Sequence, residues 1–391
     1  MKVWSKPLPN AVACPTCCEP SKFVSYRGKP FVRVLGPVRC ERGYYHCPRC
    51  HAGHFPWDAV LGLTTQELTP GAEQLVSLAG CLDSFAEGHK KILPRMAGIR
   101  LGESTIERTT EAVGKRVGDR LAAGARFGPA VDWKWQLDAE GKRCAYVSVD
   151  ATGVPQQGPG GVAADGRMPY VAMIYNPVPE DFEGKRPEWQ ARYLAGLYHL
   201  DALGAPLRRQ AAQVGWDRAD RQIALSDGGN GLEDFLRVNF PLAELILDFY
   251  HPAEKLNDLA KLWQPHDAAA AERLGHEWCH TMKHQGGQAV LDVLERLDLR
   301  GRSPTAREWH RQTVQYIRNN VHRMDYPHYL SQGWQIGSGP VESACKTVVG
   351  QRLKGAGMRW GEDGTDSVCH LRALYRSEST QWDAFWSHNF N

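Results

Sequence analysis

Tyr146-Val-Ser-Val-Asp150-Ala-Thr-Gly153 is the stretch that decides the fold, because a run of bulky, mostly apolar residues ends there in an aspartate. Alternating bulky residues before Asp150 predict a β-strand. A Gly-rich turn follows at 158–166. The predicted series then continues with strands over 170–175 and 193–200, a helix over 203–219, a strand over 222–225, a helix over 232–238 and a strand over 242–247. This order of elements predicts an α/β domain.

Two further carboxylates lie where they could share a site with Asp150. Asp227 ends a second apolar strand, in Ile223-Ala-Leu-Ser-Asp227, and strand ends are where α/β sheets bind ligands. Glu342 lies in the first turn of a predicted helix after Gly337-Ser-Gly-Pro-Val341. Any one of these acids could be an ordinary cap or turn residue. Together they predict a site for two Mg²⁺ or Mn²⁺ ions, which prefer carboxylate oxygens and support phosphoryl transfer.

Two cysteine pairs near the beginning of the chain predict a zinc ribbon. Cys14-Pro-Thr-Cys17 and Cys47-Pro-Arg-Cys50 are two CxxC motifs separated by enough chain for a β-hairpin. Four thiolates complete a closed tetrahedral Zn²⁺ site, which is structural and has no open position for catalysis. The alternative is a set of scattered thiols without metal. Other side chains could replace a ligand, namely Cys18, Cys40, His46, His51 and His54.

The first segment is also basic, and helices follow it. Between Met1 and Trp57 there are nine Lys and Arg residues against two Glu residues, so this segment could face phosphates. A solvated basic surface without a partner is the alternative reading. Helical periodicity from Pro70 to Ala123, broken at 98–101, is typical of a helix-turn-helix or of plain helical packing.

The second helix of this pair is expected to begin at Ser104 or Thr105. It carries Arg108 as the residue expected to contact DNA. Its neighbours Glu107 and Glu111 count against the reading of bases by this helix.

Length and composition limit the number of domains and the class of protein. A chain of 391 residues predicts two to four domains, and 42% hydrophobic with 23% charged residues is typical of a globular protein. No apolar run is long enough to span a bilayer, so we expect no membrane partner. The first residues lack the pattern of a secretory signal, which predicts a cytoplasmic protein. Five remaining cysteines are expected to be buried thiols, namely Cys81, Cys144, Cys279, Cys345 and Cys369.

Over nearly its whole length the chain resembles bacterial insertion-sequence transposases of the ISKra type, a DDE group. Five blocks carry the resemblance, namely Ser148-Val-Asp-Ala-Thr-Gly-Val154, Leu225-Ser-Asp-Gly228, Leu247-Asp-Phe-Tyr-His251, Gly337-Ser-Gly-Pro-Val-Glu-Ser-Ala-Cys-Lys346 and Gln351-Arg-Leu-Lys-Gly-Ala-Gly-Met-Arg-Trp360. Ala151 departs from the Gly that the family usually has after its first aspartate.

The resemblance implies an RNase H-like catalytic fold interrupted by an α-helical insertion, with Asp150, Asp227 and Glu342 as the metal-binding triad. The expected layout is a zinc-ribbon DNA-binding module at 1–60, a helix-turn-helix-like DNA-binding domain at 61–125, a catalytic domain at 140–251 and 336–376, and the insertion at 252–335.

Asp248-Phe-Tyr-His251 is similar to the Asp-x-x-His element of several DDE groups. His251 could therefore orient the scissile phosphate or pass a proton, or it could be a histidine bonded to a nearby carbonyl. Three cationic residues follow the start of the last predicted helix and surround a Gly-Ala-Gly turn, namely Arg352, Lys354 and Arg359. They predict a loop that binds DNA phosphates, with a solvated turn as the alternative.

Together these features predict a transposase that cuts element ends and joins them to target DNA. Its partners would be double-stranded DNA, both the terminal inverted repeats and the target, and we expect a homo-oligomer on that DNA. Two alternatives stay open: a non-catalytic zinc-dependent DNA-binding protein derived from a transposase, and an RNase H-like nuclease without strand transfer.

Overall fold

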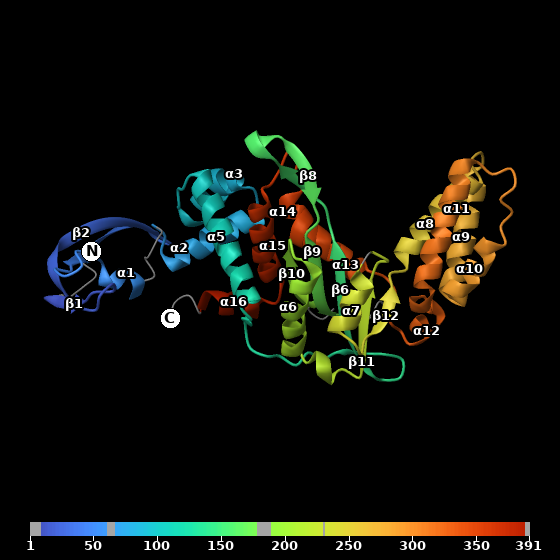
Figure 1. Ribbon diagram of the computed structural model, residues 1–391, viewed down its shortest axis with the longest axis horizontal. Helices are drawn as coiled ribbons and strands as arrows, with labels where there is room; N and C mark the ends of the chain where they lie inside the picture. The colour runs from blue at the N-terminus through green and yellow to red at the C-terminus, as the bar shows by residue number, and fades with distance from the viewer. Residues whose placement is uncertain (1–8, 61–66, 178–188, 230, 388–391) are drawn as a thin grey trace. The chain divides into compact units, whose positions relative to one another are not determined.

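The computed structural model describes residues 9–60, 67–177, 189–229 and 231–387. The chain divides into two compact units, one formed by 1–116 with 382–391 and the other by 117–381. Helix α5, Glu103–Ala122, runs from the first unit into the second (Figure 1).

The first unit begins with a four-stranded antiparallel sheet of order β1-β2-β3-β4. Its strands are β1, Ala11–Ala13, β2, Pro20–Arg33, β3, Gly36–His46, and β4, Gly53–His54. The two long strands form the extended hairpin that dominates this part of the ribbon drawing (Figure 1). Gly36 closes the hairpin with φ of +97°, a conformation that glycine adopts without steric cost.

Helices complete the first unit. They are α1, Pro56–Val60, α2, Pro70–Leu82, α3, Phe85–Glu87, a π-helical turn at Gly88–Ile92, α4, Leu93–Ala97, and α5, with α16, Ser379–Ser387, near the end of the chain. Apolar side chains of α2, α4 and α5, including Val76, Leu93 and Ile106, pack into one core. Helix α4 ends at Gly98, whose φ of 64° is left-handed, so the predicted break lies where the sequence placed it. Helix α5 begins at Glu103, one residue before the predicted cap at Ser104.

The second unit is built on a mixed sheet of order β10-β9-β6-β11-β12, with β5 paired to β6. The strands are β5, Gln136–Leu137, β6, Arg143–Ala151, β9, Tyr170–Asn176, β10, Gln190–Gly196, β11, Arg221–Ser226, and β12, Glu244–Leu247. β6, β9 and β10 are successively antiparallel, whereas β11 runs parallel to both β6 and β12. Central β6 is buried along most of its length, as its run of bulky residues requires.

Every strand predicted for this unit is present. β6 extends beyond the predicted 146–149 because Arg143 and Cys144 pair with β5 and β11. The strand predicted at 193–200 begins at Gln190 and ends at Gly196. A two-stranded hairpin of β7, Val154–Gln157, and β8, Ala163–Arg167, contains most of the predicted Gly-rich turn.

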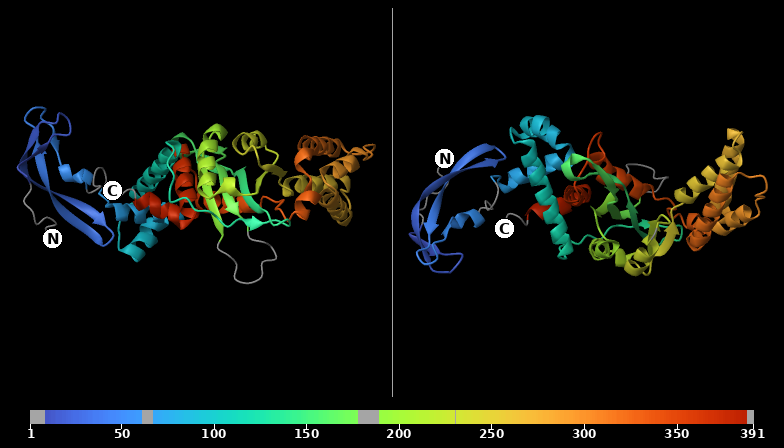
Figure 2. Two further views of the ribbon diagram at one scale, coloured as in Figure 1. Left: turned by 90° about the horizontal axis from the view of Figure 1, so that it is seen from below. Right: turned by 45° about the horizontal axis from the view of Figure 1, so that its top comes forward.

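Helices connect and cover this sheet. Helix α6, Leu200–Gln213, packs on β9 and β10, and α7, Leu232–Asn239, packs on β11 and β12. After β12 come α8, Tyr250–Trp263, α9, Ala268–Gln285, α10, Gly287–Glu295, α11, Pro304–Asn320, and α12, Tyr326–Ser331. Within the second unit these helices form a separate bundle beyond the sheet (Figures 1 and 2).

The chain returns from the bundle to the sheet through α13, Gly339–Ala344, which packs on β6 and β9. A π-helical turn at Cys345–Gly350, then α14, Gln351–Leu353, and α15, Glu362–Arg376, follow. The chain is therefore a mixed α/β protein of more than one compact unit, while the predicted four-part layout stays a prediction. In the described part of the chain, no helix combines the length and the apolar character that crossing a bilayer requires.

Candidate active site and candidate metal centre

Asp150 and Asp227 emerge at the same edge of the mixed sheet. Asp150 is the next-to-last residue of β6, and Asp227 directly follows β11. The two strands are parallel neighbours, and the Ser148 hydroxyl donates to the Leu225 carbonyl at 2.8 Å. Because parallel strands end at the same edge, strand pairing alone brings the two carboxylates together.

The Asp150 carboxylate is half-buried and hydrogen-bonded. It accepts from the Ala151 backbone N–H at 2.7 Å and from the Cys345 thiol at 3.6 Å. Burial raises the pKa of Asp150, and the negative charge of Asp227 raises it further. A cation bound at this edge would relieve both effects.

Asp227 lies in a glycine-rich loop that is hydrogen-bonded to a tyrosine of the helical bundle. The Gly229 N–H donates to Asp227 Oδ1 at 2.8 Å, and the Gly228 N–H donates to the Tyr316 hydroxyl at 3.2 Å. A Cβ atom at Gly228 would come within 2.6 Å of the Tyr316 ring, so glycine permits this approach. His251 Nε2 lies 3.7 Å from Asp227 Oδ2, which places the predicted histidine beside the second aspartate.

Hydrogen bonds through a serine and a buried aspartate link Glu342 to the site. Asp248, which is fully buried after β12, accepts the Ser338 N–H at 2.7 Å and the His251 N–H at 3.2 Å. The Ser338 hydroxyl in turn donates to Glu342 Oε1 at 2.9 Å. Asp248 therefore ties the beginning of α8 to the beginning of α13 and orients the helix that carries Glu342.

A buried arginine at the end of the helical bundle donates hydrogen bonds to the loop that carries Asp227. Arg323 donates to the Ser226 hydroxyl at 3.1 Å and to the Asp227 carbonyl at 3.4 Å. It also donates to Asn320 at 2.6 Å and lies 3.3 Å from Glu233. The arginine thus joins the end of α11 to the loop after β11.

The three predicted acids share one neighbourhood, but in the described residues they do not form a set of three ligand atoms within 4.8 Å of one another. Asp150 accepts a hydrogen bond from the Cys345 thiol, whose pKa is raised by burial first, then by the charge of Asp150 and least by that of Glu342. Within the described ranges, the only group of three or more ligand atoms within 4.8 Å of one another is formed by cysteines. Side-chain rotation would have to bring the carboxylates closer around a shared ion.

The predicted phosphate loop divides into exposed and buried cations. Lys354 and Arg359 are exposed, and Lys354 donates to the Thr152 hydroxyl two residues beyond Asp150. Arg352 is instead only 1% exposed, and its guanidinium lies 4.8 Å from the Trp360 ring centroid. Arg352 therefore supports the loop from inside and does not present its charge to solvent. In the first unit, Arg108 is exposed, and its Nε donates to the Ser104 carbonyl at 3.1 Å.

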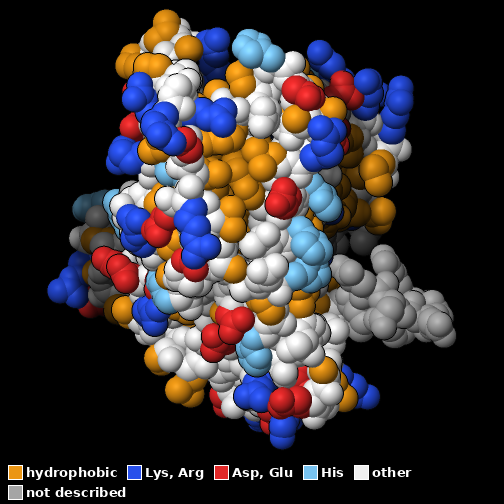
Figure 3. Space-filling view, turned by 90° about the vertical axis from the view of Figure 1, so that its right-hand side faces the viewer, with side chains coloured by type: hydrophobic (Ala, Val, Ile, Leu, Met, Phe, Trp, Pro, Cys, Tyr) orange, Lys and Arg blue, Asp and Glu red, His pale blue; other side chains and the backbone are white. Residues whose placement is uncertain are grey.

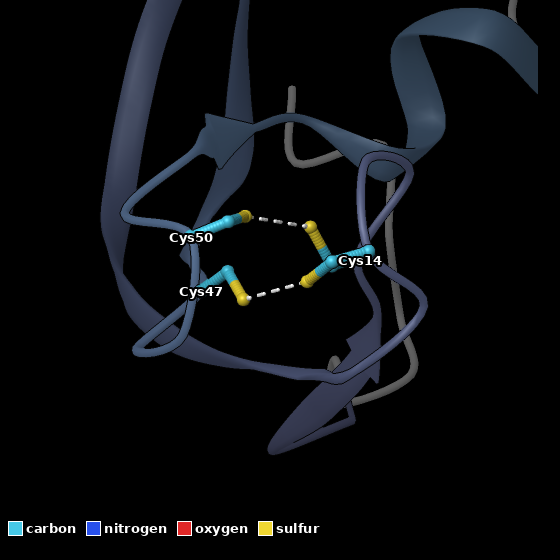
Figure 4. Close-up of side chains that lie close together, drawn as sticks. Cys14, Cys47 and Cys50 are labelled. Atoms are coloured by element: carbon cyan, nitrogen blue, oxygen red, sulfur yellow. Dashed lines mark hydrogen bonds between the residues drawn. The ribbon is translucent and has the colours of Figure 1, made fainter.

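The cysteine prediction has a direct structural counterpart. The sulfur atoms of Cys14, Cys17, Cys47 and Cys50 lie within 4.8 Å of one another and could hold a metal ion (Figure 4). Hydrogen bonds from the backbone N–H groups of Cys17 and Thr16 lower the pKa of Cys14 to about 6. The backbone N–H groups of Cys50 and Arg49 similarly lower the pKa of Cys47. Burial and neighbouring cysteine side chains instead raise the pKa values of Cys17 and Cys50. Backbone donors therefore favour thiolates at Cys14 and Cys47, which would attract a thiophilic cation.

The two CxxC turns are near-copies of each other. In each, the residue after the second cysteine has positive φ, 62° for Cys18 and 58° for His51. Each also returns its N–H to the carbonyl of the first cysteine, at 3.0 Å in both turns. Of the five cysteines expected to be buried, four are buried and Cys279 is half-buried.

Several residues of the carboxylate site escaped the sequence reasoning. Ser338 and Cys345 both belong to the block around Glu342, at spacings of four and three residues that bring helical side chains together. That spacing was a usable signal. Arg323 and Tyr316 had none, because only the return of the bundle to the sheet brings them to the Asp227 loop.

Neither a family model nor a curated protein matches this chain. The motif resemblance to insertion-sequence transposases therefore stays a prediction, and the site has to be judged from its own geometry.

Proposed function

We propose that this chain is a DNA transposase of a bacterial insertion sequence, whose mixed-sheet domain is RNase H-like and holds two divalent ions. The observation that carries the proposal is the arrangement of three acids around one sheet edge. Asp150 lies at the end of β6 and Asp227 directly follows its parallel neighbour β11, and α13 brings Glu342 to the same region. In the chain, three antiparallel strands come first and two parallel strands follow. This order agrees with the RNase H-like interpretation.

The donor chemistry fits hard divalent cations. Asp150, Asp227 and Glu342 offer only carboxylate oxygens, which Mg²⁺ and Mn²⁺ prefer. Two such ions, when bound, activate an attacking oxygen and stabilise the leaving oxygen of a phosphodiester. The burial that raises the pKa of Asp150 also keeps water away from its carboxylate, which strengthens its attraction for a cation.

Other residues of the chain would place the DNA. Lys354 and Arg359 are exposed beside the site and would bind phosphate oxygens on either side of the scissile bond. His251, close to Asp227, would orient the scissile phosphate or accept a proton from the attacking hydroxyl. The same site would first hydrolyse the element end and then direct its 3′-hydroxyl to target DNA.

The first unit would recognise the element ends. We propose that its cysteine cluster holds a structural Zn²⁺ ion and that the hairpin of β2 and β3 presents cations such as Arg27 and Arg33 to phosphates. Arg108 would add a DNA contact from α5. The working complex would be a homo-oligomer on DNA. A zinc-dependent regulator without catalysis would share these features of the first unit but would not need the three acids.

The test is cleavage and joining of a labelled duplex that carries the inverted repeats flanking the gene, with Mg²⁺ or Mn²⁺. We would compare the wild type with Glu342→Gln and with Glu272→Gln, a control acid exposed on α9. Joined products from the wild type and the control alone would support the proposal. Specific binding without cleavage by any protein would favour the regulator, and cleavage without joining would favour a nuclease. Equal activity of Glu342→Gln would remove Glu342 from the site.

A further inference from the structure

The helical bundle carries a row of histidines that the proposed function does not use. The sequence His276-Glu-Trp-Cys-His280-Thr-Met-Lys-His284 lies in the second half of α9. Its first five residues have the H-E-x-x-H spacing that places two imidazoles on one helix face. A third imidazole follows at the same spacing of four.

The structure places the three imidazoles together on the outside of the bundle. Helix α9 buries Ala271, Gly275, Trp278 and Met282. The histidines are exposed. The ring centroids of His280 and His284 are 4.4 Å apart, and those of His276 and His280 are 6.4 Å apart. Figure 3 shows the exposed face of this end of the molecule, where several His side chains are visible.

Over the ranges that the structure describes, no hydrogen bond or ion pair holds the imidazole of His276, His280 or His284. The ring nitrogens are therefore free to bind a ligand without breaking an internal contact. A neutral imidazole is the commonest protein ligand for transition metals.

We infer that His276, His280 and His284 form a surface binding site for one borderline divalent transition-metal ion such as Ni²⁺, Cu²⁺ or Zn²⁺. Imidazole nitrogen suits these ions, whereas Mg²⁺ and Ca²⁺ prefer oxygen. His280 belongs to both possible pairs, so the row binds one ion and not two. The close pair of His280 and His284 is the principal site.

The site differs in kind from a hydrolytic zinc centre. Such a centre uses at least three protein ligands, but in the described part of the chain these histidines belong to no set of three ligand atoms that lie within 4.8 Å of one another. Two nitrogens leave the remaining positions to water, so binding is exchangeable. An ion that bridges successive turns binds only the folded helix and therefore stabilises α9 by mass action.

The inference is independent of the proposed function and is tested on the full chain with zinc already bound. Ni²⁺ is titrated calorimetrically into the wild type, His276→Ala, His280→Ala and His284→Ala. His266→Ala serves as the control because His266 is an exposed histidine just before α9. Zinc retained by the protein is measured after each titration, and circular dichroism confirms that α9 still folds.

With Mg²⁺ in excess to occupy the carboxylate site, we expect one Ni²⁺ per wild-type chain and an affinity about 100-fold lower in His280→Ala, which loses both pairs. His284→Ala should weaken binding more than His276→Ala, and His266→Ala should match the wild type. Ni²⁺ should also raise the thermal midpoint of the wild type but not that of His280→Ala. Unchanged affinity in His280→Ala, an equal loss in His266→Ala, or zinc release equal to Ni²⁺ uptake would each overturn the inference.

Discussion

At the scale of single residues, Asp150 is an acid of the candidate site whose pKa the fold raises. Burial and the nearby Asp227 raise its pKa above the ordinary value of 3.8, so the folded protein holds this proton more tightly than the unfolded chain. Without metal, the contribution of Asp150 to stability is therefore fully present below pH 3.8 and is lost as pH rises through the raised pKa. The same proton competes with a metal ion, so metal affinity should fall as pH falls through that window.

Asp150→Asn should remove this pH dependence, because an amide does not titrate. The measurement is the urea midpoint of metal-free wild type and variant from acid to neutral pH, with Asp165→Asn, an exposed acid in β8, as the control. The difference between the wild-type and Asp150→Asn midpoints should grow as pH rises. Midpoints that remain parallel would contradict the prediction.

Ser338 is not a predicted metal ligand, but it positions the side chain of Glu342, which is one. Its hydroxyl donates to Glu342 and its N–H donates to buried Asp248. Ser338→Ala should lower metal affinity and DNA cleavage by about 10- to 100-fold, as losses in the shell around metal ligands usually do. Ser343→Ala is the matched control, because Ser343 is exposed on the same helix. If both variants cleave equally well, the Ser338 hydroxyl does not position Glu342.

At the scale of elements, the loop after α14 is built on the β7–β8 hairpin. The Gln157 N–H donates to the Trp360 carbonyl at 2.9 Å, and the Trp360 N–H donates to the Pro155 carbonyl at 3.1 Å. These bonds hold the loop beside the end of β6. The buried Arg352 and the exposed Arg359 therefore perform different tasks within one short segment.

Arg359→Ala should weaken binding to all DNA sequences alike and lower the salt dependence of the binding constant by about one phosphate contact. Arg352→Ala should instead destabilise the second unit by about 1–3 kcal/mol, because it removes a buried side chain. Binding titrations at several salt concentrations and denaturant unfolding separate the two effects. A loss of stability in Arg359→Ala, or a reduced salt slope with full stability in Arg352→Ala, would contradict this division.

At the scale of the whole molecule, the cysteine cluster belongs to a compact unit that does not contain the three acids. Zinc removal should therefore unfold the sheet of the first unit and leave the sheet of the second intact, because structural zinc contributes its binding energy to local folding. Limited proteolysis should cut first within 9–60. Cys17→Ala should reproduce the effect of a chelator, whereas Cys18→Ala, which changes an exposed thiol outside the cluster, should not. Equal proteolysis throughout both units would show that the zinc site supports the whole chain.

Periodicity predicted the elements of the second unit because its strands are short apolar runs separated by turns. It located their ends less well. Cys144 and Arg143 are added to β6 by pairing with neighbouring strands, and α6 ends where Gly215 adopts a φ of 74° just beyond it. Such boundaries depend on partners that are distant in the sequence, and local propensity does not contain them.

The sequence by itself determined the four cysteines that could hold a metal ion and the candidate acids. Each is recognised by its spacing or by its place at a strand end, and both are local properties. Only the tertiary structure decided that Arg352 is buried, that Asp248 and Ser338 link β12 to Glu342, and that Arg323 and Tyr316 hold the Asp227 loop. These contacts join residues up to 97 positions apart. The helical bundle supplies those of Arg323 and Tyr316, and the return of the chain through α13 supplies that of Ser338.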